Sequence, residues 1–379
     1  MSFDRRRFLG LGAGALAGGF LAVPKLVRAE GPGGLLELSG RPANYESLRS
    51  TFSTRITPLD RFYIRSHFDV PEVDTKSWRL KIQGSVASPL EVGLEELRRM
   101  PQTQVEAVLQ CSGNGRALFR PRMPGVQWAR GAMGNALWRG VRLGDLLARA
   151  KPSKGVAHLW MRGADAPAMD KAPVFLRGIP IHKALHEDTL VALTMNGEPL
   201  SAMHGAPARL VVPGWVGDDW VKWLTELTLS EEEPKGFFYE TAYRFPTKPG
   251  APGEAVPPEG MGPMTEMVPK SIIASHEPGQ VFGPGPQLIR GVALSGTARV
   301  KSVEVSVDGG QTWARAKLEP ASRYGFTVFA HPWSAVPGKY RLVSKATDES
   351  GQAQPLTPRW NPSGYLYNAL DPFDVEVKS

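Results

Sequence analysis

One segment divides the chain more clearly than any other. Residues 247–264, TKPGAPGEAVPPEGMGPM, are dense in proline and glycine and show neither helical nor strand periodicity. Proline lacks a backbone donor and glycine loses the most entropy on ordering, so such a run is typical of a connection between units. A chain of 379 residues also exceeds what one hydrophobic core usually serves. We therefore predict two domains, residues 30–264 and 265–379.

Short strand and helix patterns alternate in the first of these domains. Residues 79–84 alternate polar and apolar side chains as a half-buried strand does, and residues 105–109 form another strand candidate. Residues 94–100 have the pattern of a short helix, and residues 141–150 place four apolar side chains on one helical face. This alternation predicts a mixed α+β domain.

The second domain has a different pattern, in which short strands are separated by turn signals. Asp308-Gly309-Gly310 and Pro337-Gly338 are natural hairpin or turn sequences. The pattern predicts a β-sandwich of the immunoglobulin type, without the cysteine pair of antibody domains. The strand candidates are residues 292–294, 300–307, 326–329 and 340–343.

The first 29 residues resemble a twin-arginine export signal. DRRRFL at residues 4–9 precedes an apolar, glycine- and alanine-rich run to Val23, and Val27-Arg28-Ala29 offers a cleavage site. The apolar run is too short and too rich in glycine to span a membrane comfortably. We expect residues 1–29 to be removed, a periplasmic protein exported in its folded state, and no integral membrane segment in the mature chain.

Removal of this leader changes the charge. Residues 1–29 contain five basic residues and one acidic residue, so the formal net charge of +8 falls to +4. Such a mildly basic surface, on an exported protein, argues against a nucleic-acid partner. Residues 30–60 show little periodicity, and we predict an N-terminal arm there.

Cys111 is the only cysteine of the chain. It cannot form a disulfide within the chain, and the count excludes a c-type haem attachment and a cysteine-ligated iron–sulfur cluster. The thiol is therefore a small buried apolar group, a reactive nucleophile or a metal ligand. It ends a strand candidate and precedes the loop Ser112-Gly113-Asn114-Gly115-Arg116. Positive charge and free backbone NH groups favour a thiolate, and small residues let a bulky ligand approach the main chain.

Two further groups of residues could bind anions. In an extended segment Tyr63, Arg65 and His67 would share one face, where arginine beside neutral histidine suits an oxyanion; a solvent-facing strand is the alternative. The cationic candidates around the apolar strand 210–212 suit a phosphate-bearing cofactor, with solvated surface charge as the alternative. These are His204, Arg209 and Lys222.

An aromatic run at residues 237–246, FFYETAYRFP, completes the candidates. A phenol such as that of Tyr243 can donate a hydrogen bond or move a proton near a metal site, although aromatic residues at a domain junction are more often packing.

Several motifs, in one order, resemble the sulfite oxidase family. The molybdenum-binding domain of that family is similar to LQCSGNGR (residues 109–116), GVQW (125–128), GAMGNALWRGVRLGDLL (131–147), MHGAPARLVVPGWVG (203–217) and VKWL (221–224). Its C-terminal dimerisation domain is similar to VEVSVDGGQTWARAKLE (303–319) and RWNPSGY (359–365). The resemblance covers nearly the whole chain after the leader, and implies a sulfite oxidase fold followed by the immunoglobulin-like sandwich.

The resemblance also implies a cofactor and a site. Cys111 would ligate molybdenum beside the dithiolene of a molybdopterin, since soft sulfur suits such a metal. The substrate pocket would contain Arg65, Arg116, Tyr243 and Trp128. Residues that contact or surround the molybdopterin would be His67, His204, Arg209 and Lys222, together with Ser112 and Gly113 of the cysteine loop.

The activity that the resemblance implies is oxidation of sulfite to sulfate by a sulfite dehydrogenase. No haem domain accompanies the motifs, so electrons would pass one at a time to an external c-type cytochrome, and a homodimer is expected. Animal enzymes carry an arginine where this chain has Ser363, so the pocket would hold one positive charge fewer or recruit Arg359 or Arg244 instead. The affinity for sulfite and the identity of the substrate are therefore open at this point.

Three other functions remain open at this point. A sulfane dehydrogenase molybdenum subunit would use the same fold. An exported reductase of oxidised sulfur compounds would do so too, but that group typically lacks the C-terminal sandwich. A periplasmic binding or adhesion protein is the alternative without catalysis, because a fold does not fix a function.

Overall fold

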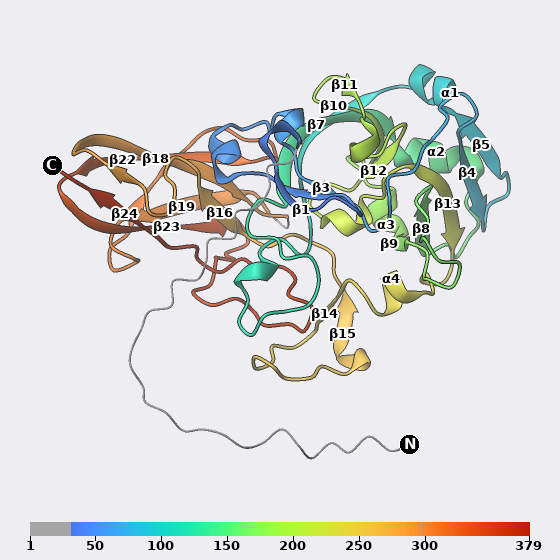
Figure 1. Cartoon of the computed structure of the whole chain (residues 1–379). Coiled ribbons are helices and arrows are strands. Elements are labelled where there is room, and N and C mark those ends of the chain that lie inside the picture. Colours follow the sequence, from blue (N-terminus) through green and yellow to red (C-terminus); the bar gives the residue numbers. More distant parts are fainter. Residues whose placement is uncertain (1–31, 297) are drawn as a thin grey trace, which may run out of the picture.

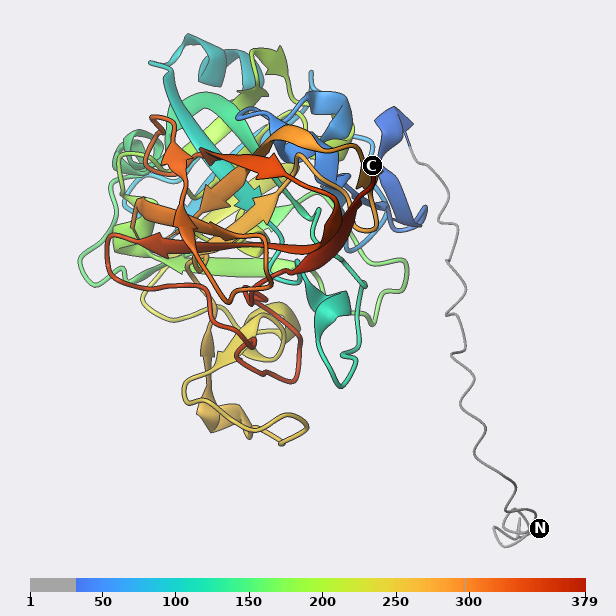
Figure 2. The same cartoon turned by 90° about the vertical axis from the view of Figure 1, so that its left-hand side faces the viewer.

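The computed structural model describes residues 32–296 and 298–379, so the predicted export signal lies outside the described residues. A larger α+β body and a β-sandwich pack against each other, with the chain from Lys270 onward, in orange to red, forming the strands of the sandwich (Figure 1). Turned by 90°, the sandwich lies in front of the α+β body (Figure 2). Within the described residues no helix has the length and apolar character needed to cross a membrane.

The predicted N-terminal arm is a small sheet. Strands β1 (Leu36–Ser39), β2 (Asn44–Glu46) and β3 (Ile64–Arg65) pair antiparallel in that order. Strands of two to four residues are too short to show an alternating pattern, which is why the sequence suggested irregular structure. The pairing of Asn44 with Arg65 fixes the chain next to the candidate anion-binding residues.

Two five-stranded sheets form the α+β body. In the first sheet β11 (Glu198–Pro199), β10 (Leu190–Met195), β7 (Met133–Arg142) and β6 (Thr103–Gln110) follow one another, and β12 (Arg209–Val211) also pairs with β10. The second sheet has the order β5 (Leu90–Gly93), β4 (Arg79–Gly84), β13 (Leu224–Ser230), β8 (His158–Gly163), β9 (Leu176–Pro180).

Four short helices accompany these sheets: α1 (Leu94–Arg99), α2 (Leu143–Ala150), α3 (Ile181–Ala184) and α4 (Phe237–Glu240). In α2 the side chains of Leu143, Leu146, Leu147 and Ala150 are fully buried, as their helical spacing predicts. The preceding residues Val141 and Arg142 belong to β7, so the helix begins two residues later than the apolar pattern does.

The proline-rich connection contains more structure than its composition indicates. Strand β14 (Arg244–Pro246) pairs antiparallel with β15 (Met261–Pro263), and the intervening residues form a loop at the ribbon's end. A ribbon of two strands tolerates proline because only one edge of each strand is paired.

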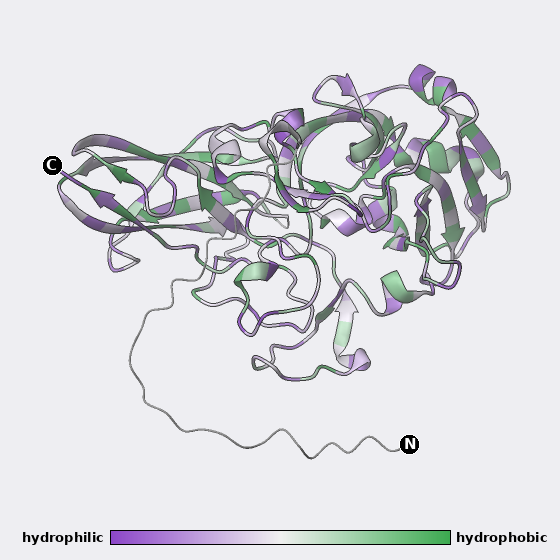
Figure 3. Ribbon diagram, viewed as in Figure 1, coloured by the Kyte–Doolittle hydropathy of each residue, from purple (hydrophilic) through white to green (hydrophobic). Residues whose placement is uncertain are grey.

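The sandwich consists of two sheets. One has the order β16 (Lys270–Ile273), β18 (Gly285–Leu294), β22 (Thr327–Ala335), β21 (Lys317–Leu318). The other has the order β17 (Val281–Phe282), β24 (Phe373–Val377), β23 (Gly338–Asp348), β19 (Val300–Ser306), β20 (Ala314–Arg315). Hydrophilic and hydrophobic residues alternate along these strands (Figure 3). The predicted fold class, an α+β domain followed by an immunoglobulin-like sandwich, is confirmed.

The two turn signals of the sandwich make different connections between strands. Asp308-Gly309-Gly310 connects the paired strands β19 and β20, as a hairpin does. Pro337-Gly338 instead carries the chain from β22 in one sheet to β23 in the other, so it is a turn but not a hairpin.

The two bodies share a continuous core. Phe52 meets Phe326 edge-on at 6.0 Å between ring centroids, and the amide of Val108 donates to the carbonyl of Tyr324 at 2.8 Å. Because Val108 lies on β6, the sandwich directly supports the strand that ends at Cys111.

Candidate active site

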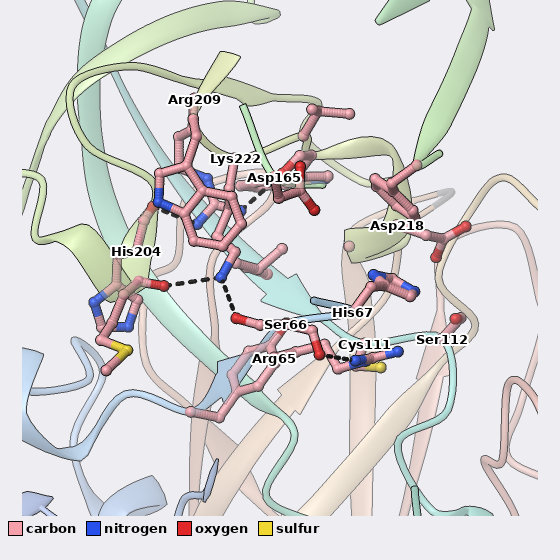
Figure 4. A pocket seen from close by; sticks show the side chains of 18 of the residues that line it. Arg65, Ser66, His67, Cys111, Ser112, Asp165, His204, Arg209, Asp218 and Lys222 are labelled. Atoms are coloured by element: carbon pink, nitrogen blue, oxygen red, sulfur yellow. Dashed lines mark hydrogen bonds between the residues drawn. The ribbon is translucent and has the colours of Figure 1, made fainter. Parts of the chain in front are cut away.

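A cavity of about 660 Å³, partly open to solvent, lies where β3, β6 and β12 end. Figure 4 shows its side chains converging from these strands and from the loops around them. Eight of the eleven predicted site residues line the cavity. They are Arg65, His67, Cys111, Ser112, His204, Arg209, Lys222 and Tyr243.

Cys111 directly follows β6 and opens a tight loop. Its amide donates to the carbonyl of Ala132 at 2.9 Å, and its carbonyl accepts from the amide of Asn114 at 2.9 Å. Burial raises the pKa of the thiol, while the charges of Arg65 and Arg116 act in the opposite direction. The positive charges that the sequence suggested are therefore present, but burial outweighs them in the protein alone. A bound cation that takes the thiolate would reverse this balance.

Tyr63, Arg65 and His67 all reach the cavity, as the alternation along an extended segment predicts. Arg65 donates through Nη1 to Oδ1 of Asn44 at 3.3 Å and to the carbonyl of Ser66. Its other nitrogens remain for an anion, and the guanidinium is rigid enough to bind two oxygens at once.

His67 and Tyr243 form a pair beside this arginine. Nε2 of His67 is hydrogen bonded to the hydroxyl of Tyr243. Burial, Arg65 and Lys222 hold the pKa of His67 well below its ordinary value, so the imidazole is neutral at pH 7. Burial raises the pKa of Tyr243, so the phenol keeps its proton and can donate it to the neutral ring.

Three further groups at the cavity have no acidic hydrogen-bond partner among the described residues: Arg209 and His204 are buried, and Lys222 is half-buried. Arg209 donates from Nη1 to the carbonyl of His204 and from Nη2 to that of Trp220, each at 3.0 Å. Lys222 donates from Nζ to Oγ of Ser66 and to the carbonyl of Met203, each at 3.0 Å (Figure 4). Nε of Arg209 and Nε2 of His204 have no partner among the described residues.

Burial explains the electrostatics of this cationic group. It lowers the pKa of Arg209 to about 10 and that of His204 to about 3, and it holds the pKa of Lys222 well below its usual range. Buried cations with spare donors are costly unless an anion compensates them. The group therefore fits an anionic ligand such as a phosphate.

An acidic pair on the cavity wall was not singled out from the sequence. Asp218 and Asp219 are buried in the 3₁₀ turn Gly217–Asp219, and both bind Arg177 of β9. Asp218 lines the cavity, and its Oδ1 has no well-formed hydrogen bond within the described part of the chain. The tandem acids directly after GWVG were a visible signal, whereas nothing near them pointed to Arg177.

Three predicted residues do not line the cavity: Arg116, Trp128 and Gly113. Arg116 donates from Nε to the carbonyl of Ser363 at 2.9 Å and from Nη1 to that of Val126 at 3.1 Å. Trp128 is fully buried and meets Tyr63 edge-on at 6.2 Å, so it supports a wall residue from behind. Arg116 still lies close enough to Cys111 to influence the thiol electrostatically.

No arginine replaces the one that animal enzymes have at the position of Ser363. Arg359 donates to the carbonyl of Pro246 at 2.5 Å, and Arg244 donates to that of Met261 at 2.7 Å. Both are thus held in the β14–β15 ribbon, and neither lines the cavity.

Two other residues of the cavity wall, Asp165 and Phe175, carried no sequence signal at all. Phe175 stacks on His67 at 4.3 Å between ring centroids.

Comparison with known proteins agrees with this site. Residues 67–238 match the family described as "Oxidoreductase molybdopterin binding domain", and residues 263–378 match "Mo-co oxidoreductase dimerisation domain". The sulfite oxidase of Arabidopsis thaliana is 32% identical over 356 residues, which cover 86% of this chain and 89% of that protein. The mitochondrial sulfite oxidase of Rattus norvegicus is 33% identical, covering 89% of this chain but only 65% of that protein.

A solved structure is similar over most of its length. The sulfane dehydrogenase SoxCD from Paracoccus pantotrophus has a TM-score of 0.78 and 29% identity, covering 90% of this chain and 88% of that chain. Fold, cavity and matches together define a molybdopterin-dependent oxidoreductase. More narrowly, the chain belongs to the sulfite oxidase family.

The residues present fit the molybdenum–molybdopterin cofactor of this family. Cys111 offers one soft sulfur donor, and the described residues contain no cluster of three or more His, Cys, Asp or Glu that could hold a metal without further ligands. A metal here must bring ligands of its own, as the metal of a dithiolene cofactor does. Arg209, Lys222 and His204, with their spare or poorly compensated donors, suit the cofactor's phosphate.

Proposed function

We propose that this chain is a periplasmic sulfite dehydrogenase, which oxidises sulfite to sulfate and passes electrons singly to an external c-type cytochrome. The observation that carries the proposal is the placement of Arg65 at the same cavity as Cys111, together with the cationic residues Arg209 and Lys222. The overall reaction converts sulfite and water into sulfate, two protons and two electrons.

The chain's own residues have separate tasks in this reaction. The bound cofactor would supply oxygen-atom transfer and two-electron redox chemistry. Arg65 binds the sulfite oxygens and orients the sulfur lone pair away from the guanidinium. Arg116 adds positive potential from behind the cysteine loop. Tyr243 and neutral His67 form a short path along which a proton can leave.

Aromatic side chains shield His67 from water. Phe175 covers one face of His67, and Phe238 meets the same ring edge-on at 5.1 Å. A low-dielectric wall of this kind strengthens the attraction between Arg65 and an oxyanion.

Location and partners belong to the proposal as well. The twin-arginine pattern supports export to the periplasm, and the match of residues 263–378 to a dimerisation domain supports a homodimer. A single cysteine cannot form the C-x-x-C-H attachment motif of a c-type haem, which supports an external cytochrome as the proposed acceptor.

The test is metal analysis of the protein exported by its own host, combined with sulfite-dependent reduction of cytochrome c or ferricyanide. We expect about one molybdenum per chain, together with sulfite-dependent reduction. Molybdenum without sulfite turnover would refute sulfite as the substrate. Protein without molybdenum, exported by a host that can insert the cofactor, would refute the enzyme assignment.

A sulfane dehydrogenase subunit is the second candidate. The similarity to SoxCD favours it, and so does the lack of a third arginine at Ser363, which leaves a less cationic pocket. Activity on a protein-bound persulfide, with inertness towards free sulfite, would select this alternative.

A further inference from the structure

A segment of the second domain forms the back of the cysteine loop. The segment lies between β23 and β24, and the amide of Leu366 donates to the carbonyl of Ser112 at 2.9 Å. Fully buried Asn361 holds the backbone of Tyr365 from both sides: Oδ1 accepts from its amide at 2.8 Å, and Nδ2 donates to its carbonyl at 2.9 Å. The position of Tyr365 is thus fixed by its own segment.

The ring of Tyr365 lies between two predicted site residues. The guanidinium carbon of Arg116 is 5.0 Å from its centroid, and the ring of Tyr243 is stacked on it at 5.6 Å with an interplanar angle of 18°. Both contacts are attractive, one between a cation and an aromatic face and the other between two rings. A single side chain therefore touches the arginine and the phenol at once.

The side chain of Arg116 is also confined by its other neighbours. A Cβ atom at Gly113, Gly125 or Gly364 would come within 2.8–2.9 Å of its side chain. Its Nε and Nη1 are occupied by backbone carbonyls, whereas Nη2 makes no hydrogen bond within the residues described. The guanidinium packs against Gly113 of the cysteine loop and does not line the cavity, so Arg116 acts on the site through its charge. The face of Tyr365 and the two carbonyls together hold that charge behind Cys111.

We propose that Tyr365 is a positioning residue for capture of the oxyanion substrate. It holds the charge of Arg116 behind the cysteine loop and the ring of Tyr243 at the cavity wall, so the second domain sets the affinity of the pocket in the first. The inference rests on the proposed function, since it names the residue that orients two of its groups.

The experiment compares holoenzyme variants that differ at this ring. Tyr365→Leu and Tyr365→Met remove the flat aromatic face, whereas Tyr365→Phe keeps it and is the matched control. The first readout is whether each substitution changes KM or kcat for sulfite. The second is the rise in Tm produced by sulfate, which reports oxyanion binding without turnover.

We expect KM for sulfite to rise about tenfold in the Leu and Met variants, the loss of one well-formed contact, with kcat changing less than threefold. The sulfate-induced rise in Tm should shrink in the same two variants, and the Phe variant should match wild type in both readouts. Wild-type KM and a wild-type sulfate response in either folded Leu or Met variant would overturn the inference.

The two proposals can fail separately. If wild type shows the sulfate response but does not oxidise sulfite, the proposed function is wrong. A loss of that response in the Leu and Met variants, retained in Phe, would then still support Tyr365 as the positioning residue. An equal loss in all three variants would contradict it, because the ring face would not be the cause.

Discussion

Arg177 donates to a single oxygen of Asp219, from Nε at 3.0 Å and from Nη2 at 2.8 Å. The same guanidinium also binds Asp218, so one buried cation serves two buried carboxyl groups. Burial outweighs the attraction of Arg177 and, with the charge of Asp218, raises the pKa of Asp219 to about 7. Below about pH 7, folded Asp219 therefore retains a proton that the unfolded chain releases above about pH 4.

This pair predicts how stability depends on pH. Between pH 4 and pH 7 the folded protein binds a proton at Asp219 that the unfolded chain does not, because the ordinary pKa of Asp is 3.8. The free energy of unfolding must then fall as pH rises through this range. Asp219→Asn keeps an oxygen acceptor for Arg177 and should flatten that slope, which urea unfolding at several pH values would measure. The exposed Asp170→Asn is the control, and an unchanged slope in Asp219→Asn would contradict the prediction.

The metal-ligand assignment predicts the behaviour of Cys111→Ser. Serine is a poor ligand for a soft metal, so turnover should fall by at least about 1,000-fold. The half-buried position implies a stability change below about 1 kcal/mol, measurable by thermal unfolding. Sulfite-dependent activity close to wild type in a folded Cys111→Ser protein would remove Cys111 from the metal.

The sequence predicted elements wherever side-chain periodicity is long enough to read. Strand β4 has the predicted bounds, and the apolar face of α2 is buried as expected. The sheet β1–β2–β3 and the ribbon β14–β15 were missed because their strands are too short for a pattern.

For the site, motif spacing located the residues but not their surroundings. Arg116 is turned from the cavity by the carbonyl of Ser363, which lies 247 residues further along the chain. Arg177 and Asp219 likewise meet only because β9 passes the turn that carries the aspartate. Contacts between distant segments depend on packing, and no local pattern encodes them.

Arg65→Met tests the anion-binding role. Methionine keeps much of the side-chain volume but removes the charge and the donors, so kcat/KM for sulfite should fall about 100-fold, mainly through KM. Steady-state kinetics with varied sulfite would measure this. Arg61→Met, an exposed arginine on the same segment, is the matched control. If both variants behaved alike, general surface charge rather than Arg65 would account for anion capture.

Lys222→Met tests the cofactor contact. Its Nζ is held by Ser66 and the carbonyl of Met203. Burial lowers the pKa of Lys222 although Asp165 favours its charge, so an anionic ligand would offset the remaining cost. The variant should fold at least as well as wild type but retain less molybdenum, by about tenfold, when purified under the same conditions. The measurement is the molybdenum content of Lys222→Met compared with that of Lys235→Met, a control at an exposed lysine. Full molybdenum content in Lys222→Met would place the cofactor's anionic group elsewhere.

Asp371 joins the two bodies, and its removal should loosen them. It binds Arg130 through two hydrogen bonds and Arg49 at 2.9 Å, and these arginines hold its pKa below the ordinary value although burial alone would raise it. Asp371→Ala leaves Arg130 without this carboxylate and Arg49 with only the more distant Glu277 at 3.9 Å, and it should cost about 3 kcal/mol. The exposed Asp374→Ala should cost almost nothing. The depressed pKa of Asp371 contributes its full stabilisation above about pH 4, and that contribution is lost as pH falls further, through the depressed pKa. Acid should therefore narrow the difference between wild type and Asp371→Ala. Chemical unfolding at pH 7 and pH 3 measures both effects, and equal stability of the two alanine variants at pH 7 would show that this ion pair does not hold the sandwich to the α+β body.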